Sequence, residues 1–530
     1  MVERTIPAVT IPAAIATAAR RFGDAEALVE PGGVRMSFRD LHERVGEVAR
    51  ALIADGLVPG DRVAVWCPNT PAWVLAALGA LTAGATLVPV STRFTGAEAL
   101  DVISRSRARA LFVDNEFLGV DRLAALRAAS LSPGEAHSGS LAGVAAVVPV
   151  GGDDWKIFTE RKLATLRPYG AARAAAVSGD DVSDILFTSG TTGRSKGAMS
   201  SHRSALAVAR AWASHAGLTA GDRYLVVNPF FHSFGYKAGI LACLVSGATL
   251  VPMPVFDVAA VLRVISAERI TVLPGPPTIY QALLDSPARS EFDLSSLRVA
   301  VTGAATVPTA LVERMGRELS FRVVLTAYGL TEAVVATMCR PGDALPLVAR
   351  TCGRAAAGFE VRIGDPGAPG GLADVGTTGE VLLRGPNLML GYLDDPAATA
   401  AAIDAGGWLH TGDVGRLDPG GYLTISDRLT DLYICGGFNV YPAEVEQVLA
   451  RLSGVVEAAV VGVPDERLGE VGRAYVVPRS GSQLDEAAVV DFCRSQLANY
   501  KVPRQVVFRD ALPRNPGGKV LKRLLRNEPG

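Results

Sequence analysis

The segment Thr188–Gly197 (TSGTTGRSKG) has the composition of a loop that binds phosphate groups. It follows an apolar, strand-like run, Asp184–Phe187, and it combines hydroxyl side chains, three glycines and Lys196, one of only seven lysines in the chain. Glycines let backbone N–H groups approach a polyphosphate, and hydroxyl groups and an ammonium group complete the cradle. The order Ser-Lys-Gly excludes a Walker A loop, which requires Gly-Lys followed by Ser or Thr. The alternative is an ordinary turn rich in serine and glycine.

Short apolar strands alternate with helical patterns through the first two thirds of the chain, which predicts parallel sheets covered by helices. The strand-like runs are Arg62–Trp66, Ala110–Val113, Ile270–Leu273, Leu297–Val301 and Val323–Thr326. Two strings also resemble each other: AGATLVPV (Ala83–Val90) and SGATLVPM (Ser246–Met253). In both, an apolar run ends at a glycine, which suits the end of a helix. We therefore expect two related α/β subdomains; the alternative is that ATLVP is a common buried-strand string.

The pattern changes after residue 360, where turn residues become dense and short β-rich pieces follow. Beyond Asp427 we expect a helix from Pro442, two strands, a second helix and a last strand near Val506–Phe508. The fold class is therefore α/β: a large N-terminal domain of two related parallel-sheet subdomains plus a small β-rich subdomain, and a small, mobile C-terminal α+β domain. We expect the domains to span residues 1–429 and 430–530.

Composition limits the classes of protein. Of the 530 residues, 49% are apolar and 20% charged, and 52 basic against 53 acidic residues give a net charge of −1. This balance offers no general attraction to nucleic acid or anionic membranes. The six cysteines form no CxxC pair, which fits a reducing compartment. Two long apolar stretches, Trp73–Thr92 and Ala238–Phe256, are each interrupted by glycine, so we interpret them as a buried helix, a turn and a buried strand. We expect a cytoplasmic protein without a membrane span.

The phosphate loop resembles the signature of the adenylate-forming superfamily, which includes acyl-CoA synthetases, luciferases and peptide-synthetase adenylation domains. The resemblance extends from Phe38 to Arg526 and rests on further motifs in the expected order: NPFFHSFGY (Asn228–Tyr236), VTGAA (Val301–Ala305), AYGLTEA (Ala327–Ala333), GEVLLRGPNLMLGY (Gly379–Tyr392), WLHTGDVG (Trp408–Gly415), SDRLTDLYICGGFNVYPAEVE (Ser426–Glu446) and NPGGKVLKR (Asn515–Arg523). Within the superfamily, the strings around Asn228–Tyr236 and Thr271–Gln281 look most similar to actinobacterial ligases of steroid breakdown. Those enzymes activate a propanoate side chain on the remnant of steroid rings C and D.

The resemblance implies a reaction in two halves: a carboxylate attacks the α-phosphate of ATP to give an acyl-adenylate and pyrophosphate, and the thiol of CoA then displaces AMP. The phosphate-binding residues that it implies are Thr188, Ser189, Gly190, Thr191, Thr192, Gly193 and Lys196. It implies that Thr331 contacts the α-phosphate and that Glu332 holds Mg²⁺, a cation that prefers oxygen ligands. The alternative for Glu332 is a solvated loop acid. However, its segment follows an apolar strand, and ligands of open α/β sheets bind beyond the carboxyl ends of strands.

By the same resemblance, Asp413 accepts hydrogen bonds from both ribose hydroxyls and Arg428 adds a second ribose contact. Tyr328 stacks on adenine. The remaining adenosine-binding positions are Gly303, Ala304, Ala305 and Gly329.

His232 is a catalytic candidate because the resemblance places it against the carboxylate and the α-phosphate. Without the surrounding motif, a histidine among phenylalanines is better interpreted as a buried core residue. The acyl pocket that the resemblance implies is lined by Phe231, Ser233, Phe234, Tyr236, Pro276 and Gly303.

Lys519 is the strongest catalytic candidate, because a mobile ammonium after two glycines reaches both carboxylate and α-phosphate. The alternative is a surface lysine beside Lys522 and Arg523. Gly436 and Gly437 leave room for the pantetheine arm of CoA. Two positions depart from the family pattern: Ser195 replaces the usual proline before the loop lysine, and the hinge residue, commonly Asp or Lys, is Thr430.

The sequence therefore predicts an ATP-dependent carboxylic acid–CoA ligase that uses ATP, Mg²⁺ and coenzyme A. The expected acyl substrate is a bulky alicyclic propanoate from steroid ring degradation. The alternatives are a medium- or long-chain fatty acyl-CoA ligase, an enzyme that loads a carrier-protein thiol, and a nucleotide-binding protein without turnover. The expected partners are these small molecules and not nucleic acid; a homodimer is left open.

Overall fold

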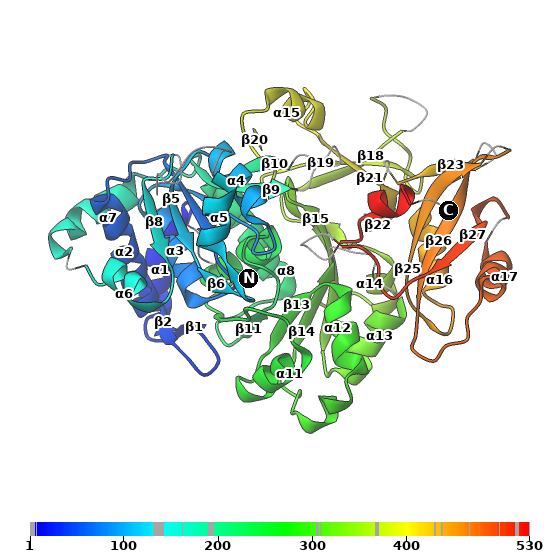
Figure 1. Ribbon diagram of the computed structural model, residues 1–530, viewed down its shortest axis with the longest axis horizontal. Helices are drawn as coiled ribbons and strands as arrows, with labels where there is room; N and C mark the ends of the chain where they lie inside the picture. The colour runs from blue at the N-terminus through cyan, green and yellow to red at the C-terminus, as the bar shows by residue number, and fades with distance from the viewer. Residues whose placement is uncertain are drawn as a thin grey trace.

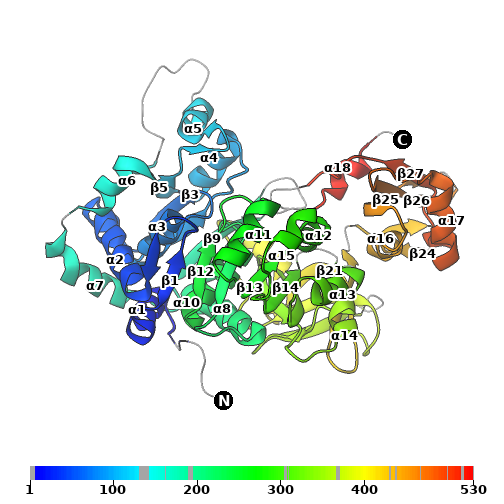
Figure 2. The ribbon, with the colours of Figure 1, turned by 90° about the horizontal axis from the view of Figure 1, so that it is seen from below.

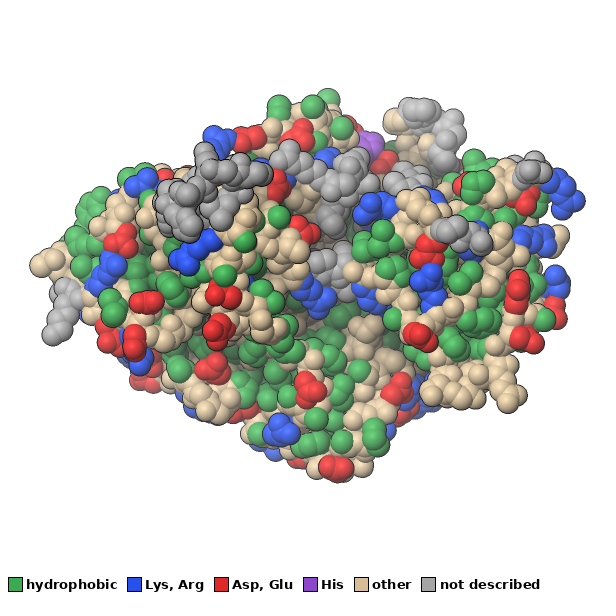
Figure 3. Space-filling model, in the orientation of Figure 1, with side chains coloured by type: hydrophobic (Ala, Val, Ile, Leu, Met, Phe, Trp, Pro, Cys, Tyr) green, Lys and Arg blue, Asp and Glu red, His purple; other side chains and the backbone are tan. Residues whose placement is uncertain are grey.

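The computed structural model describes residues 6, 8–130, 143–161, 163–188, 195–303, 307, 309–365, 370–428, 431–435, 438–465, 467–497, 499–514 and 519–528. Two large sheets and a smaller β-rich unit make up most of the molecule, and the C-terminal residues form a separate unit at one end (Figures 1 and 2). Acidic and basic side chains are interspersed over the face shown in Figure 3, in keeping with the near-zero net charge. None of the described helices is both long enough and apolar enough to span a bilayer.

The first large sheet has seven strands, and its order across the sheet is β20 (Gly391–Tyr392), β10 (Lys196–Ser201), β9 (Val182–Thr188), β4 (Thr86–Pro89), β3 (Arg62–Trp66), β5 (Ala108–Val113) and β8 (Ala146–Pro149). The strands from β9 to β8 are parallel, whereas β10 runs antiparallel to β9 and to β20. The helices of this region are α1 (Ile11–Phe22), α2 (Phe38–Ala54), α3 (Pro71–Thr82), α4 (Gly96–Arg105), α5 (Arg122–Ser130), α6 (Gly152–Thr159) and α7 (Arg167–Ala176), with the 3-10 turn η1 (Ala164–Leu166). A two-stranded ribbon, β6 (Glu116–Phe117) and β7 (Val120–Asp121), precedes α5.

The second large sheet has nine strands in the order β17 (Arg354–Ala355), β16 (Ala333–Met338), β15 (Val323–Leu330), β14 (Val299–Gly303), β13 (Val272–Gly275), β11 (Arg223–Val226), β12 (Thr249–Pro252), β1 (Glu26–Val29) and β2 (Arg35–Ser37). Its helices are α8 (His202–Ala216), α9 (Ser233–Gly235), the π-helix η2 (Tyr236–Leu241), α10 (Ala242–Ser246), α11 (Val258–Ala267), α12 (Pro277–Asp285), η3 (Pro287–Glu291), α13 (Thr309–Glu318) and α14 (Leu345–Arg350). Helix α8 contacts β9 and β10 of the first sheet and β16 of the second. One hydrophobic core extends across both sheets.

The repeated strings form equivalent units in the two sheets, as predicted. Strand β3 pairs in parallel with β4 through Arg62↔Thr86, and β11 pairs with β12 through Arg223↔Thr249. A glycine with positive φ lies between the helix and each second strand, Gly84 at +82° and Gly247 at +81°. The two long apolar stretches are thus buried helices and strands, as expected.

The sheets are mixed at their edges, although the apolar pattern predicted parallel pairing. The connections from β9 to β10 and from β15 to β16 are short, and parallel neighbours need a crossover of a dozen or more residues. Antiparallel pairing is therefore the geometry available at these connections.

The smaller β-rich unit is a four-stranded antiparallel sheet in the order β18 (Glu360–Gly364), β19 (Gly379–Arg384), β21 (Leu409–Leu417) and β22 (Leu423–Arg428), with α15 (Pro396–Ala402) nearby. The C-terminal sheet contains β24 (Phe438–Val440), β23 (Tyr433–Cys435), β26 (Gly469–Pro478), β25 (Val455–Asp465) and β27 (Gln505–Phe508). Its helices are α16 (Pro442–Leu449), α17 (Glu486–Gln496), η4 (Asn499–Lys501) and α18 (Lys522–Arg526). A hydrophobic core of its own, from Tyr433 to Leu525, holds this unit together.

Candidate active site

The phosphate loop connects two antiparallel strands. Thr188 ends β9 and Lys196 begins β10; the two residues are paired, and the Thr188 hydroxyl donates to the Lys196 carbonyl oxygen at 3.4 Å. The other predicted phosphate ligands, Ser189, Gly190, Thr191, Thr192 and Gly193, lie outside the described residues. A strand and not a helix follows the loop, so the described residues after it supply positive charge through the Lys196 side chain and not through a helix N-terminus.

Arg105 of α4 contacts both ends of this loop. Its guanidinium lies 5.1 Å from the ring centroid of Phe187, just before the loop, and donates to the Ser195 carbonyl oxygen at 2.8 Å, just after it. Asp101 accepts a hydrogen bond from the same Nη1 at 3.1 Å and so fixes the guanidinium. Ser195 replaces a proline of the family pattern. Its backbone is therefore held by a hydrogen bond from Arg105, where a proline ring would restrict it directly. No sequence pattern indicated this contact, because α4 is far from the loop along the chain.

Tyr392 joins Lys196 to Glu332. Its ring centroid lies 5.1 Å from the Lys196 ammonium, and its hydroxyl donates to Glu332 Oε1 at 2.8 Å. Burial and the charge of Glu332 raise the pKa of Tyr392, so the phenol stays protonated and remains a donor. Strand β20 brings Tyr392 here by pairing Tyr392 with Ala198 of β10. Tyr392 had no predicted role, and its position in the string GPNLMLGY was the only signal for it.

Thr331 and Glu332 form the turn between β15 and β16, and both are half-buried. The Glu332 carbonyl oxygen accepts a hydrogen bond from the Met389 amide at 2.8 Å, which braces the turn. Among the described residues, no group of three or more His, Cys, Asp or Glu side chains could hold a metal ion. A site with fewer acidic side chains fits Mg²⁺, since this ion is commonly bound by one or two carboxylates, such as that of Glu332, together with substrate phosphates.

Tyr328 and Asp413, both predicted to bind adenosine, are in direct contact. The Tyr328 hydroxyl donates to Asp413 Oδ2 at 2.6 Å, and Asp413 is only 4% exposed. Asp413 pairs along the backbone with Arg428. Strands β15 and β21 thus bring together two residues that the resemblance assigns to the nucleoside.

Gly303 ends β14 beside Ala327 of β15. A Cβ at Gly303 would lie 2.5 Å from the Ala327 carbonyl oxygen, so only glycine fits. Gly329 lies at an irregularity in the pairing of β15 with β16, a feature common next to active sites. Ala304 and Ala305 lie outside the described residues.

The segment that carries His232 is held by Asn69, which lies in the turn between β3 and α3. The Asn69 amide donates to the carbonyl oxygen of Asn228 at 2.9 Å, and its Oδ1 accepts from the Phe230 amide at 2.8 Å. Gly235 permits the tight fold of the segment, because a Cβ there would lie 2.2 Å from the Pro229 carbonyl oxygen.

His232 is exposed, but the protein atoms around its ring desolvate it and lower its pKa from the usual 6.5. Its Nδ1 accepts a hydrogen bond from the Phe234 amide at 3.2 Å. A neutral ring with Nδ1 as acceptor carries its proton on Nε2. The geometry therefore presents an N–H donor, which suits a carboxylate or phosphate oxygen.

The predicted acyl-pocket residues differ in burial. Phe231, Phe234 and Pro276 are half-buried, and Phe234 packs edge-on against Trp212 at 5.2 Å. Ser233 is 4% exposed and Tyr236 is completely buried, with its ring 6.0 Å from that of Trp73. A pocket lined by this whole set stays a prediction.

In the C-terminal unit, Lys519 is exposed next to the β-bridge between Arg514 and Val520. Lys522 instead forms an ion pair with Glu446 at 2.8 Å, with both side chains largely buried. The hinge candidate Thr430 and the CoA-tunnel candidates Gly436 and Gly437 lie outside the described residues.

Comparison with known proteins identifies the class. The sequence profile of the family described as AMP-binding enzyme matches residues 15–393, and that of the AMP-binding enzyme C-terminal domain matches residues 444–519. The chain belongs to the AMP-binding enzymes of the adenylate-forming superfamily, and like its CoA-ligase relatives it is an acid–thiol ligase that uses ATP and CoA.

Individual relatives show which members of this class the chain is similar to. A Rhodococcus jostii protein named 3-[(3aS,4S,7aS)-7a-methyl-1,5-dioxo-octahydro-1H-inden-4-yl]propanoyl:CoA ligase is 57% identical over 526 residues, and the match covers 98% of each chain. A Mycobacterium tuberculosis protein of the same name is 57% identical over 520 residues, again with 98% of each chain covered. The ATP-bound structure of MatB from Rhodopseudomonas palustris matches with a TM-score of 0.83 at 30% identity, covering 98% of each chain.

Proposed function

We propose that this acid–CoA ligase activates a bulky alicyclic propanoate derived from steroid rings. The observation that carries the proposal is the 57% identity, over nearly the full length of both chains, with a ligase named for a methyl-dioxo-octahydroindene propanoate. The aromatic surroundings of His232, including Phe231 and Phe234, suit an acid with a large apolar ring system.

In the first half-reaction, a carboxylate oxygen attacks the α-phosphorus of ATP, the bond to the bridging oxygen of the β-phosphate breaks, and pyrophosphate leaves. Both reactants are anions, so the site must first neutralise charge. Lys196 offers an ammonium group supported by the Tyr392 ring, and the His232 Nε2–H donates to the carboxylate or the α-phosphate. We assign Thr331 to contact with the α-phosphate, and Asp413 to accept hydrogen bonds from the ribose. Mg²⁺, held by Glu332 and the phosphates, would supply further positive charge.

In the second half-reaction, the sulfur of CoA attacks the acyl carbonyl carbon, the thiol proton is lost to solvent, the bond from that carbon to the phosphate oxygen breaks, and AMP leaves. We assign Lys519 to the first half-reaction only and propose that a C-terminal domain of residues 430–530 turns about Thr430 to replace Lys519 with the Gly436–Gly437 segment, past which pantetheine enters. The separate hydrophobic core of the C-terminal unit supports a domain able to move as a body. The six free cysteines support a location in the reducing cytoplasm. A homodimer is one oligomeric state to test.

Product analysis tests the proposal. With the indene propanoate, ATP, Mg²⁺ and CoA, the enzyme should form acyl-CoA and AMP in equal amounts, together with pyrophosphate. AMP formation that required a carrier-protein thiol in place of CoA would favour the carrier-loading alternative, and preference for octanoate or longer acids would favour the fatty acyl alternative.

A further inference from the structure

Lys237 and Asp184 form an ion pair inside the protein. Lys237 is 1% exposed and Asp184 is completely buried, and Lys237 Nζ lies 2.9 Å from Asp184 Oδ1. Lys237 Nζ also donates to Ser200 Oγ at 2.6 Å, and Ser183 Oγ donates to Asp184 Oδ2 at 2.7 Å. The pair and its hydrogen bonds are thus shielded from solvent.

A pair of this kind is not explained by stability. Taking two charges out of water costs several kcal/mol per ion, and well-packed apolar replacements are often neutral or stabilising. The contact between Oδ1 and Nζ is moreover not aligned as a hydrogen bond. The role of the ion pair is therefore better inferred from the segments that it connects than from its contribution to stability.

The pair joins the strands of the phosphate loop to the segment of His232. Asp184 on β9 and Ser200 on β10 lie opposite each other, four residues along the two strands from Thr188 and Lys196, which flank the loop. Lys237 lies on η2, which follows His232 and α9. Strands β9 and β10 belong to the first sheet, whereas η2 lies between β11 and β12 of the second. The ion pair therefore bridges the two subdomains beneath the site.

The segment Asn228–Leu241 is thus fastened at two points, to the turn between β3 and α3 and to strand β9. Asn69 holds its beginning, and Asp184 holds Lys237 beyond His232. Lys237 lies in the π-helix η2 at the end of this segment. The π-helix is a rare form of helix, and the known examples are frequently found at functional sites. Next to it, the buried Tyr236 hydroxyl has no hydrogen-bond partner among the described residues, and burial together with the charge of Asp184 raises the Tyr236 pKa.

We propose that Asp184 and Lys237 are positioning residues for adenylate formation. They set the His232 segment, which faces the carboxylate, at a fixed distance from the loop that holds the ATP phosphates. Attack requires the reacting atoms at about 3–3.5 Å, and a displacement of about 1 Å can cost roughly 100-fold in rate. The inference rests on the proposed role of His232.

The double variant Asp184→Asn with Lys237→Met tests the proposal, because it removes both charges and leaves neither uncompensated. We expect a folded protein in which ATP–pyrophosphate exchange, driven by the indene propanoate, falls about tenfold or more. Thioester formation from supplied acyl-adenylate and CoA should stay near the wild-type rate. The single variant Lys237→Met leaves a buried carboxylate without its cation and should also lower the melting temperature.

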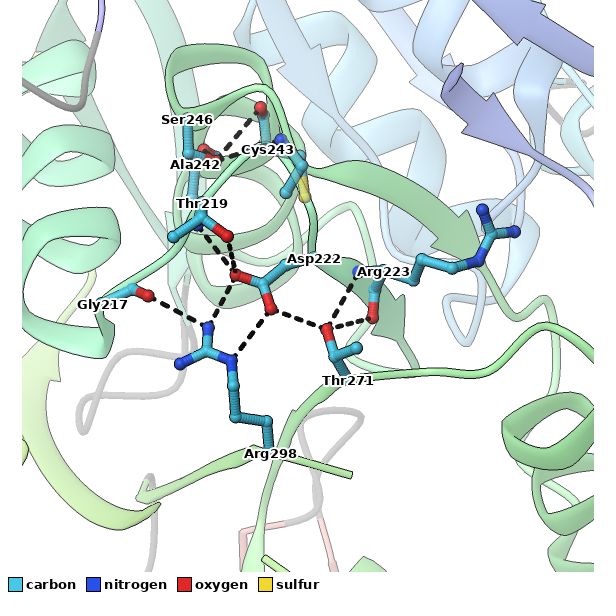
Figure 4. A network of polar contacts seen from close by, with 10 residues as sticks. Gly217, Thr219, Asp222, Arg223, Ala242, Cys243, Ser246, Thr271 and Arg298 are labelled. Carbon is cyan, nitrogen blue, oxygen red and sulfur yellow. Dashed lines mark hydrogen bonds and ion pairs between the residues drawn. The ribbon is translucent and has the colours of Figure 1, made fainter. Parts of the chain in front are cut away.

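A matched control is the pair Arg298–Asp222, which lies 2.6 Å apart with Asp222 buried (Figure 4). Asp222 directly precedes β11, whereas Asn228 and His232 follow the opposite end of that strand. The double variant Asp222→Asn with Arg298→Met should lose melting temperature without changing the ratio of the two half-reaction rates.

Wild-type exchange in the Asp184/Lys237 double variant, or an equal loss in both half-reactions, would overturn the positioning role. A wild-type enzyme that forms no adenylate from the indene propanoate would instead contradict the proposed function, so the two failures are distinguishable.

Discussion

The hydroxyl of Tyr392 donates to Glu332 at 2.8 Å, and the same side chain lies against the Lys196 ammonium. One aromatic residue thus contacts both the candidate metal ligand and the lysine of the phosphate loop. Its hydroxyl orients the carboxylate, and its ring supports the cation.

Tyr392→Phe should therefore raise the KM for MgATP about tenfold while the protein stays folded. A hydrogen bond to a charged group contributes about 1.5–3 kcal/mol, and phenylalanine removes the bond but keeps the ring under Lys196. Initial-rate kinetics at varied MgATP measures the effect. Tyr422→Phe is the matched control, since Tyr422 donates to Asp343 at 2.8 Å outside the candidate site. Equal effects of the two substitutions would argue against the role of Tyr392.

Arg105→Ala should loosen the phosphate loop and lower kcat/KM for ATP about fivefold, in line with one lost hydrogen bond of about 1 kcal/mol. Adding Ser195→Pro should restore part of the loss, because proline restricts the backbone that Arg105 otherwise holds. ATP–pyrophosphate exchange measures both variants. Arg107→Ala, which removes an exposed arginine paired with Asp394, serves as control. No change in Arg105→Ala would mean that the loop is ordered without this contact.

The sequence predicted the architecture better than it predicted contacts between distant segments. The strings Ala83–Val90 and Ser246–Met253 indicated two equivalent units because helix ends and buried strands leave local patterns. Arg105, Tyr392 and Lys237 were missed, since each makes a contact between segments far apart in the chain that no local pattern specifies.

His202 makes folding sensitive to acid. It is 1% exposed, its Nδ1 accepts from the Ile11 amide at 3.3 Å, and burial lowers its pKa from 6.5 to about 4. Between these values the unfolded chain binds a proton that the folded chain does not, so the free energy of unfolding falls as pH decreases from 6.5 toward 4. Urea unfolding at a series of pH values should show this slope, and His202→Gln should make it shallower. An unchanged slope would assign the acid sensitivity to other groups.

Lys519→Ala should abolish acyl-adenylate formation, with a loss of about 100- to 1000-fold or more, yet leave thioester formation from supplied acyl-adenylate near the wild-type rate. Arg523→Ala serves as the control. Lys522→Ala would be a poorer one, because Lys522 is paired with Glu446 and loss of that pair should also lower the stability of the protein. Equal losses in both half-reactions of a folded Lys519→Ala protein would contradict the proposal that the C-terminal domain adopts two positions.

The central claim concerns the acid that this ligase activates, and the most direct test compares kcat/KM for CoA-dependent AMP formation across acids. We expect the methyl-dioxo-octahydroindene propanoate to exceed octanoate and benzoate by at least about tenfold, since the ring system would fill an apolar pocket and each buried methylene contributes about 0.8 kcal/mol. A higher kcat/KM with octanoate or benzoate than with the ring-bearing propanoate would contradict the account.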